Sequence, residues 1–193
     1  MTVPTAKVQT LSHYIRQLDS AALAFSSGVD SALLAYLGAR ELGDKFIAIT
    51  VESPLLLKGD LADAIRFCTQ YGIHHKVLPM DILSDVNFRA NDAQRCYYCK
   101  NLIFSTIRDY ADSHGFEQLL DGSNSEDCPK RRPGMRALVE QNIHSPLRKC
   151  NFSKADIRAL SKEWGLFTWD KESDSCRATR IPQGTTITLD ALR

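Results

Sequence analysis

The chain has 193 residues, of which 24 are lysine or arginine and 23 are aspartate or glutamate, so its formal net charge is +1. Apolar residues make up 44% and charged residues 24%, values typical of a soluble globular domain, which exclude a fibrous or disordered chain. No apolar run approaches the roughly 18 residues of a membrane helix, and the first residues do not resemble a secretory signal. We therefore expect a cytoplasmic protein without membrane contact, and the near-zero charge argues against bulk attraction to nucleic acid.

Apolar periodicity predicts strands and helices that alternate along the chain. Helices are expected at residues 7–18, 31–42, 61–71, 101–114 and 154–164. Continuous apolar runs predict strands at residues 21–25, 46–51, 75–80 and 118–120, and the segment 167–193 is expected to be an irregular loop with a short strand. This order predicts one α/β domain, residues 1–193, with a parallel five-stranded sheet and helices on both faces.

A short polar loop separates the first predicted strand from the helix that follows it. The loop contains Ser26, Ser27 and Gly28, and Asp30 and Ser31 begin the helix. A strand-to-helix turn directs backbone N–H groups and the positive end of the helix dipole at its ligand, so this loop predicts a phosphate site. Asp30 is expected either to orient the loop or to contact Mg²⁺. An ordinary serine and glycine turn is the alternative.

The six residues S-S-G-V-D-S at positions 26–31 resemble the S-G-G-x-D-S signature of the PP-loop ATP pyrophosphatases. The resemblance implies a Rossmann-like fold that binds ATP, adenylates a substrate and releases pyrophosphate. Ser27 stands where the family has its first glycine. If that position requires a positive φ, the Cβ of serine costs about 1–2 kcal/mol, and ATP binding is then expected to be weaker.

Motifs further along the chain resemble the sulfur-transferase branch called LarE. They are D-G-S-N-S-E-D at 121–127, R-P-G-M-R at 132–136, S-P-L at 145–147, K-A-D-I-R at 154–158, W-D-K at 169–171 and C-R-A-T-R-I-P-Q-G-T at 176–185. The resemblance implies ATP-dependent insertion of sulfur into a pyridinium dicarboxylate mononucleotide, a precursor of the nickel-pincer cofactor of lactate racemase. It also implies that the segment 167–193 contributes to the active site.

Charged residues in these motifs suit such a substrate. Asp121, beside Gly122, and Glu126 offer carboxylates for Mg²⁺ or for ribose hydroxyls, unless they form a solvated acidic turn. Basic side chains cluster over residues 130–136, with Arg132 and Arg136 expected to bind phosphate or carboxylate. Arg180 is expected to form a second anion-binding point. A solvated basic face is the alternative for the cluster.

Three of the six cysteines suggest sulfur chemistry. Cys96 and Cys99 form a C-x-x-C pair just ahead of a predicted helix, a spacing compatible with zinc, a redox disulfide or an iron–sulfur cluster. Cys176 belongs to a motif that the resemblance places at the active site. The resemblance implies a 4Fe–4S cluster on these three thiolates, and it implies Cys176 and Asp30 as catalytic residues. A disulfide, an adventitious zinc ion and inert thiols are the alternatives, and some LarE-like proteins instead donate the sulfur of a single cysteine.

The leading hypothesis is therefore an ATP- and Mg²⁺-dependent sulfur transferase acting on a small carboxylate nucleotide. Thiolation of tRNA or another adenylating ligation is a second hypothesis, although no RNA-binding module is evident. A nucleotide- or cluster-binding accessory protein without turnover is a third. LarE proteins generally continue into a smaller C-terminal domain beyond the G-T-T-I-T segment, so a homo-oligomer or a separate C-terminal partner is also expected.

Overall fold

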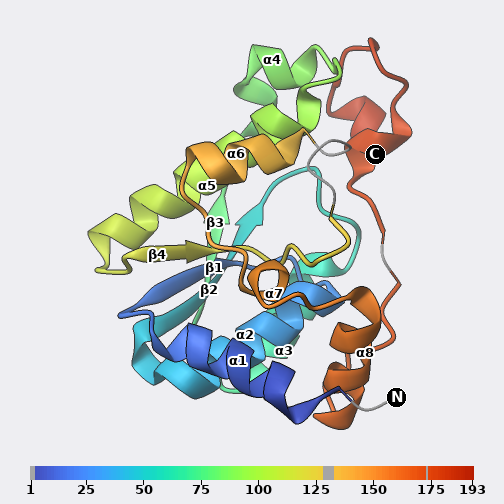
Figure 1. Ribbon diagram of the computed structural model, residues 1–193. Helices are drawn as coiled ribbons and strands as arrows, with labels where there is room; N and C mark the ends of the chain where they lie inside the picture. The colour runs from blue at the N-terminus through green and yellow to red at the C-terminus, as the bar shows by residue number, and fades with distance from the viewer. Residues whose placement is uncertain (1–2, 128–132, 173) are drawn as a thin grey trace.

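The computed structural model describes residues 3–127, 133–172 and 174–193, and its strands form one parallel sheet (Figure 1). The strands are β1 (Ala21–Ala24), β2 (Phe46–Glu52), β3 (His75–Pro79) and β4 (Gln118–Leu120). Their order in the sheet is β3-β2-β1-β4, and every pairing is parallel. Register pairs Ala21 with both Phe46 and Gln118, so β1 is central. The first three strands thus lie on one side of the point where the chain crosses over to β4.

The sheet has four strands in the described part of the chain, and the prediction of five is wrong. The segment 167–193 contains no described strand. Where a fifth strand would extend the sheet beside β4, only His144 forms a parallel bridge, to Leu120. Asn142 just before it has a left-handed backbone with φ of 53°, and Pro146 just after it begins a helix. The extended stretch between them is too short to form a ladder.

Helices cover both faces of the sheet, as predicted (Figure 1). The α-helices are α1 (Thr5–Arg16), α2 (Val29–Leu42), α3 (Asp60–Gln70), α4 (Val86–Arg89), α5 (Arg95–Ser113), α6 (Gly134–Glu140), α7 (Pro146–Lys149) and α8 (Lys154–Glu163). Residues of α1, α2, α3, α7 and α8 share one apolar core with β1 and β2. On the other face, Ile107 and Ala111 of α5 pack against Ala22, Ile49 and Leu119. The alternation of side chains along each strand supplies both cores.

Short 3₁₀ turns complete the fold: η1 (Gly43–Lys45), η2 (Ile82–Ser84), η4 (Arg177–Arg180) and η5 (Asp190–Leu192). The last two belong to the segment after α8, which we call the C-terminal tail, residues 167–193. Its Ala178, Ile181, Ile187 and Leu192 are buried with Phe88 of α4 in a small separate core. The tail is therefore packed onto the molecule, although it lacks the predicted strand.

Local sequence explains where two functionally placed helices begin. Ser153 caps α8: its Oγ accepts from the backbone N–H of Asp156 at 3.2 Å, and the Asp156 carboxylate accepts from the N–H of Ser153 at 2.9 Å. Helix α5 begins at Arg95, earlier than the predicted residue 101. Cys96 and Cys99 therefore lie inside the first turns of α5 rather than ahead of it, on one helix face.

None of the described helices combines the length and the apolar character needed to cross a lipid bilayer.

Candidate active site

The loop after β1 leaves the start of α2 open to a ligand. Gly28 is the N-cap residue, with φ of −76° and ψ of 161°, and no side chain caps the helix there. The hydroxyls of Ser26 and Ser31 lie 3.1 Å apart, and Ser31 Oγ also donates to the Gly28 carbonyl at 3.1 Å. Backbone N–H groups of the first turn of a 14-residue helix are thus free of side-chain caps. Such a turn attracts an anion such as phosphate.

Ser27 does adopt the positive φ that its glycine-like position suggested. Its φ is 56°, and the residue is completely buried. The Ser27 side chain, which glycine lacks, forms two hydrogen bonds. Its Oγ donates to the Asp60 carbonyl at 3.2 Å and accepts from Lys171 Nζ at 3.2 Å. These hydrogen bonds offset part of the strain of about 1–2 kcal/mol.

Asp30 lies in the first turn of α2 and has one carboxylate oxygen without a described partner. We call residues 26–31 the phosphate loop. Asp30 Oδ2 accepts from Lys154 Nζ at 2.6 Å, an ion pair that joins this loop to the start of α8. Its Oδ1 is buried and has no hydrogen-bond partner. A buried polar atom without a partner costs about 1–3 kcal/mol, so Oδ1 is an expected place for a cation or a ligand donor.

The loop after β4 packs directly against the phosphate loop. A Cβ added at Gly122 would lie 3.0 Å from the Ser31 backbone nitrogen and 3.2 Å from its Cα, so only glycine fits. Asp121 is buried, and its two carboxylate oxygens accept from the hydroxyls of Ser123 and Ser145. β1 and β4 are neighbours on either side of the crossover point of the sheet. The carboxyl ends of strands at such a point are where open α/β sheets bind ligands.

Three lysines connect this site to other parts of the chain, and sequence reasoning assigned a role to none of them. Lys154 holds Asp30, as described, and Lys100 of α5 lies 3.5 Å from the Asp121 carboxylate. Lys171 donates to Asp60 at 3.2 Å and to Asp63 at 2.9 Å as well as to Ser27. Burial lowers the pKa of Lys171, but the hydrogen bonds that Lys171 donates to Asp63 and Asp60, with the negative charge of both carboxylates, outweigh it and raise the pKa above its ordinary value.

Cys96, Cys99 and Cys176 are brought into one neighbourhood, where their charges interact. Burial, with smaller contributions from the Cys176 and Cys96 thiols, raises the pKa of Cys99 to about 12, although Lys100 and Arg95 act to lower it. Cys176 is exposed as a residue, but partial burial of its thiol raises the pKa, and Cys96 raises it further. The backbone N–H groups of Ala178 and Thr179, together with Arg95, act in the opposite direction and lower the pKa. Among the described side chains, no three His, Cys, Asp or Glu residues converge closely enough to hold a metal ion.

Asn91 and Arg95 hold the tail against α5 and thereby bring Cys176 near the other cysteines. Arg95 Nη1 donates to Asn91 Oδ1 at 2.6 Å and to the Ala178 carbonyl at 2.8 Å. Asn91, fully buried, donates to the carbonyls of Pro182 and Thr185, both at 2.9 Å. No motif in the sequence predicts this arrangement, because its hydrogen bonds join segments that are about ninety residues apart in the chain.

A pocket of about 380 Å³ opens beside Cys96, between the start of α5 and the tail. Arg95, Arg180 and Thr179 also line it. Arg180 is mostly exposed and lies 3.7 Å from Asp174. The pocket thus places the predicted anion-binding Arg180 on the same cavity as one of the predicted cluster ligands.

Two predicted binding residues have structural partners in this state. Arg136 lies over the ring of Tyr97, with 3.6 Å to its centroid, and pairs with Glu140 at 3.3 Å. Glu126 is exposed and accepts from the backbone N–H of Lys154 at 2.8 Å, at the start of α8. Arg132, with the neighbouring basic residues 130 and 131, lies outside the described residues.

This architecture defines a class of protein: a nucleotide-binding α/β domain of the PP-loop kind, with its phosphate loop at the crossover point of a parallel sheet. Residues 5–108 match the family model described as NAD synthase. The domain also resembles the solved U34-tRNA thiolase of Methanococcus maripaludis with its 4Fe–4S cluster, at 16% identity and a TM-score of 0.63, over 88% of this chain and 68% of that one. That likeness concerns the fold.

Two relatives align along nearly the whole chain. An uncharacterized protein of Synechocystis is 36% identical over 188 residues, which are 97% of this chain and 70% of the relative. The pyridinium-3,5-bisthiocarboxylic acid mononucleotide synthase of Lactiplantibacillus plantarum is 32% identical over 191 residues, which are 98% of this chain and 69% of the relative. The chain therefore belongs to the LarE-like sulfur transferases of the PP-loop ATP pyrophosphatase superfamily.

Proposed function

We propose that this protein uses ATP to activate a carboxylate of a pyridinium mononucleotide and converts it into a thiocarboxylate. One observation carries the proposal: the uncapped start of α2, with the buried and unpartnered Asp30 Oδ1, lies at the sheet edge where β4 also ends. The name of the Lactiplantibacillus relative supports a pyridinium carboxylate mononucleotide as the substrate class.

The phosphate loop is assigned to the pyrophosphate part of ATP. Backbone N–H groups near Gly28 and Ser31, with the Ser26 hydroxyl, would bind the phosphate oxygens, and the dipole of α2 favours their negative charge. Asp30 fits Mg²⁺ because its Oδ1 is a carboxylate oxygen without a hydrogen-bond partner in the first turn of α2. Bound there, Mg²⁺ would offset charge on the phosphates.

In the first step, a substrate carboxylate oxygen attacks the α-phosphorus of ATP. The bond from this phosphorus to the bridging oxygen breaks, pyrophosphate leaves, and an acyl-adenylate forms. Lys100 and Lys171 are the cations placed to balance negative charge near Asp121 and Ser27. In the second step, sulfide sulfur attacks the carbonyl carbon, and AMP leaves with the electron pair of the broken carbon–oxygen bond.

Cys96, Cys99 and Cys176 are the proposed holders of a 4Fe–4S cluster. Thiolates are the usual ligands of iron–sulfur clusters, and the electrostatic coupling among these three thiols supports their lying in one neighbourhood. A cluster on three thiolates supplies an iron without a protein ligand, able to carry an extra sulfide. The C-terminal tail, residues 167–193, thereby becomes part of the active site.

Arginines are assigned to the anionic parts of the substrate. Arg180 lines the pocket beside Cys96, so a carboxylate or phosphate bound there would lie next to the proposed sulfur donor. Arg136 would first have to leave Glu140 and the ring of Tyr97. Arg132 is retained from the sequence as a candidate phosphate ligand.

The test of catalysis is pyrophosphate release from ATP and Mg²⁺, with and without pyridinium-3,5-dicarboxylate mononucleotide, in anaerobically purified protein. We expect release that depends on the substrate and a product heavier by the exchange of oxygen for sulfur. Asp30→Asn should reduce release at least tenfold, whereas the exposed Asp19→Asn should leave it unchanged. Release stimulated by bulk tRNA instead of the mononucleotide would contradict the assignment of substrate.

The test of the cysteines is a separate measurement of iron and labile sulfide after anaerobic reconstitution. Cys96→Ala, Cys99→Ala and Cys176→Ala should each take up less than half the iron of the wild type and lose its broad brown absorbance. Cys150→Ser, a change of a thiol outside this neighbourhood, should retain both. Full iron uptake by any of the three alanine variants would remove that residue from the ligand set.

A further inference from the structure

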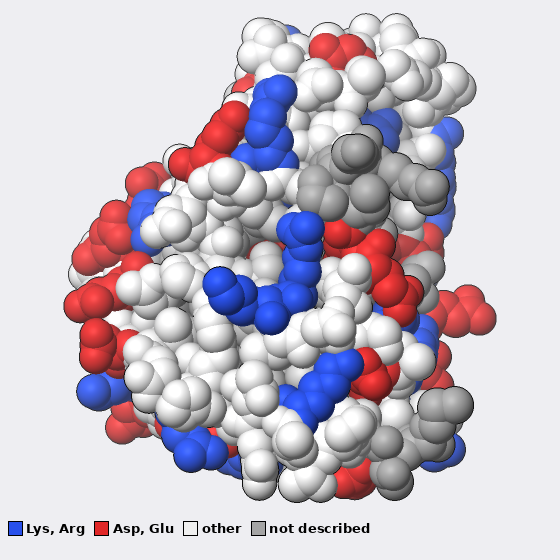
Figure 2. Space-filling view, viewed as in Figure 1, with Lys and Arg blue, Asp and Glu red and all other residues white. Residues whose placement is uncertain are grey.

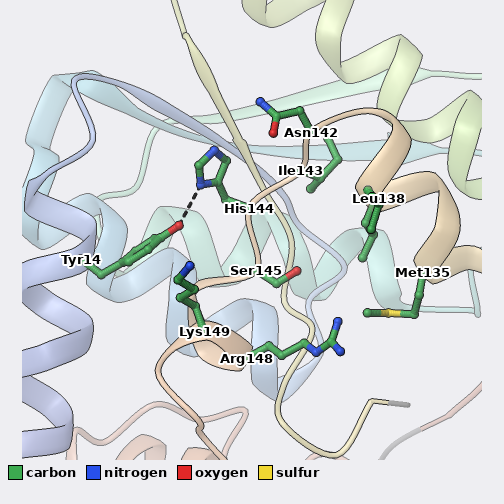
Figure 3. Close-up of a pocket in the computed structure, with 10 residues that line it drawn as sticks. Tyr14, Met135, Leu138, Asn142, Ile143, His144, Ser145, Arg148 and Lys149 are labelled. Atoms are coloured by element: carbon green, nitrogen blue, oxygen red, sulfur yellow. Dashed lines mark hydrogen bonds between the residues drawn. The ribbon is translucent and has the colours of Figure 1, made fainter. Parts of the chain in front are cut away.

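A second pocket, of about 440 Å³, opens beside the segment 142–145, which borders the edge of β4 (Figure 3). Its wall is formed by α1, α6, α7 and the segment between α6 and α7. Figure 3 shows side chains from these separate elements turned toward a common space. The pocket is distinct from the phosphate loop and from the cysteines, and none of the proposed chemistry uses it. Its volume is within the range of roughly 300–1,000 Å³ that suits small-molecule ligands.

The pocket is positively charged. Arg148 and Lys149 line it, and no aspartate or glutamate does. In the described part of the chain, neither side chain forms an ion pair, although most lysines and arginines around them do. The same face in Figure 2 shows basic side chains gathered at the centre, where α7 lies in Figure 1, with acidic side chains beside them on the right. Two adjacent cations without partners attract an anion.

A polar pair forms one side of the pocket. Tyr14 Oη and His144 Nδ1 are 2.8 Å apart and share a hydrogen bond that joins α1 to the edge of the sheet. The Lys149 ammonium group points toward this pair in Figure 3. Burial, together with the charges of Lys149 and Arg108, lowers the pKa of His144, so its ring is neutral at pH 7. Positive charge in the pocket therefore comes from the two cations.

The opposite side of the pocket is apolar. Met135 and Leu138 of α6 face it, with Ile143 beside them. The Arg148 guanidinium extends toward Met135 in Figure 3, so the charged and apolar parts of the wall adjoin. A flexible methionine accommodates flat ring systems of different shapes. A ligand that fills this space thus has a flat apolar body and a charged end.

We infer that this pocket binds a small organic anion, with its carboxylate or phosphate group between Arg148 and Lys149 and its flat apolar body against Met135 and Leu138. The pocket adjoins the active site without being part of it: the Ser145 hydroxyl, which lines it, donates to Asp121 Oδ1 at 2.6 Å. The inference does not depend on the proposed sulfur transfer.

Binding is tested with phenyl phosphate and benzoate, which carry the two anionic groups on the same ring. Phenol and inorganic phosphate, which each carry only the ring or only the anionic group of phenyl phosphate, serve as controls. Titration calorimetry is done with the phosphate loop saturated by a non-hydrolysable ATP analogue, so that binding there does not contribute. We expect one site for an aromatic anion, with either control binding at least tenfold more weakly. The preferred anionic group identifies a phosphate or a carboxylate as the natural end of the ligand.

Substitutions of the pocket residues test whether the anion binds in this pocket. Arg148→Gln and Lys149→Gln should each weaken it about tenfold, as expected when a charge-assisted hydrogen bond is lost, whereas Lys45→Gln, at an exposed position outside the pocket lining, should not. The His144 ring resonance, identified by its absence in His144→Gln, should shift on binding. The inference is overturned if neither aromatic anion binds, or if binding persists in the double Arg148→Gln and Lys149→Gln variant while the His144 resonance stays in place.

Discussion

Gly122 offers a direct test of how the two loops position the active site. Its Cβ in Gly122→Ala would lie 3.0 Å from Ser31 N and 3.2 Å from Ser31 Cα. Ordinary contacts of carbon atoms are about 3.5–4.0 Å, so the loops must separate by roughly half an ångström. Both contacted atoms are backbone and cannot rotate away. Overpacking of this kind costs about 1–3 kcal/mol, equivalent to a fall in Tm of roughly 3–10 °C for a domain of this size.

Because the phosphate loop itself moves, Gly122→Ala should also weaken ATP binding by about tenfold or more. The assays are thermal unfolding by calorimetry and ATP titration in the presence of Mg²⁺. Gly28→Ala is the matched control for stability: its φ is −76°, and the nearest atom to an added Cβ is Ser26 Oγ at 3.4 Å. Because glycine is favoured over alanine at an N-cap, that variant should lower Tm slightly, and by less than Gly122→Ala. An unchanged Tm and ATP affinity in Gly122→Ala would refute the argument that this contact positions the phosphate loop.

Three further predictions concern charge. Lys171→Met leaves two aspartates without their cation and should lower stability by about 1–2 kcal/mol in thermal unfolding, whereas Lys58→Met, at an exposed position, should not. Burial raises the pKa of Asp156, but hydrogen bonds to Lys7 and Ser153 outweigh it and lower the pKa, so its contribution is present above the unfolded pKa of about 3.9 and is lost as pH falls through the lower folded value. Urea unfolding of Asp156→Asn should therefore depend less on pH below about pH 5 than that of the wild type. Iodoacetamide at pH 8 should label the exposed Cys96 at least about tenfold faster than Cys99, measured by peptide mass mapping.

Two outcomes would contradict these predictions. Equal acid sensitivity of the wild type and Asp156→Asn would mean that the ion pair with Lys7 does not influence unfolding. Labelling of Cys99 as rapid as that of Cys96 would mean that the thiol is not buried in solution.

The strands of the sheet were predictable because each is a continuous apolar run, which needs burial on both faces. Their order was not, since it depends on which helices pack on which face. The predicted fifth strand was wrong: it was expected within residues 167–193, where the described residues form only the 3₁₀ turns η4 and η5. Beside β4, only His144 pairs with the sheet. The tail was expected to be irregular, and its buried Ile181 and Ile187 were missed because they follow no period.

The phosphate loop was predicted from local sequence, since its chemistry lies in six consecutive residues. The lysines that hold it could not be found in this way. Lys154 is 124 residues from Asp30, and Lys171 is 144 residues from Ser27. The motifs that contain these lysines were noticed, but a motif does not tell which distant carboxylate its lysine meets. The roles predicted for Asp30, Arg180 and the three cysteines remain predictions, although the structure brings Cys96 and Arg180 to one pocket.

Ser27 changes how the departure from the glycine signature should be understood. A positive φ at a serine costs about 1–2 kcal/mol, and two hydrogen bonds of its hydroxyl contribute about 0.5–1.5 kcal/mol each. These amounts are comparable, so the substitution is close to neutral for the fold. It has a further consequence that glycine could not have: the hydroxyl ties the phosphate loop to Lys171, and hence to the tail that carries Cys176. In this chain, the hydrogen bond from Lys171 to Ser27 couples the conformation of the phosphate loop to the start of the tail, whereas Asn91 and Arg95 hold the part of the tail that follows Cys176.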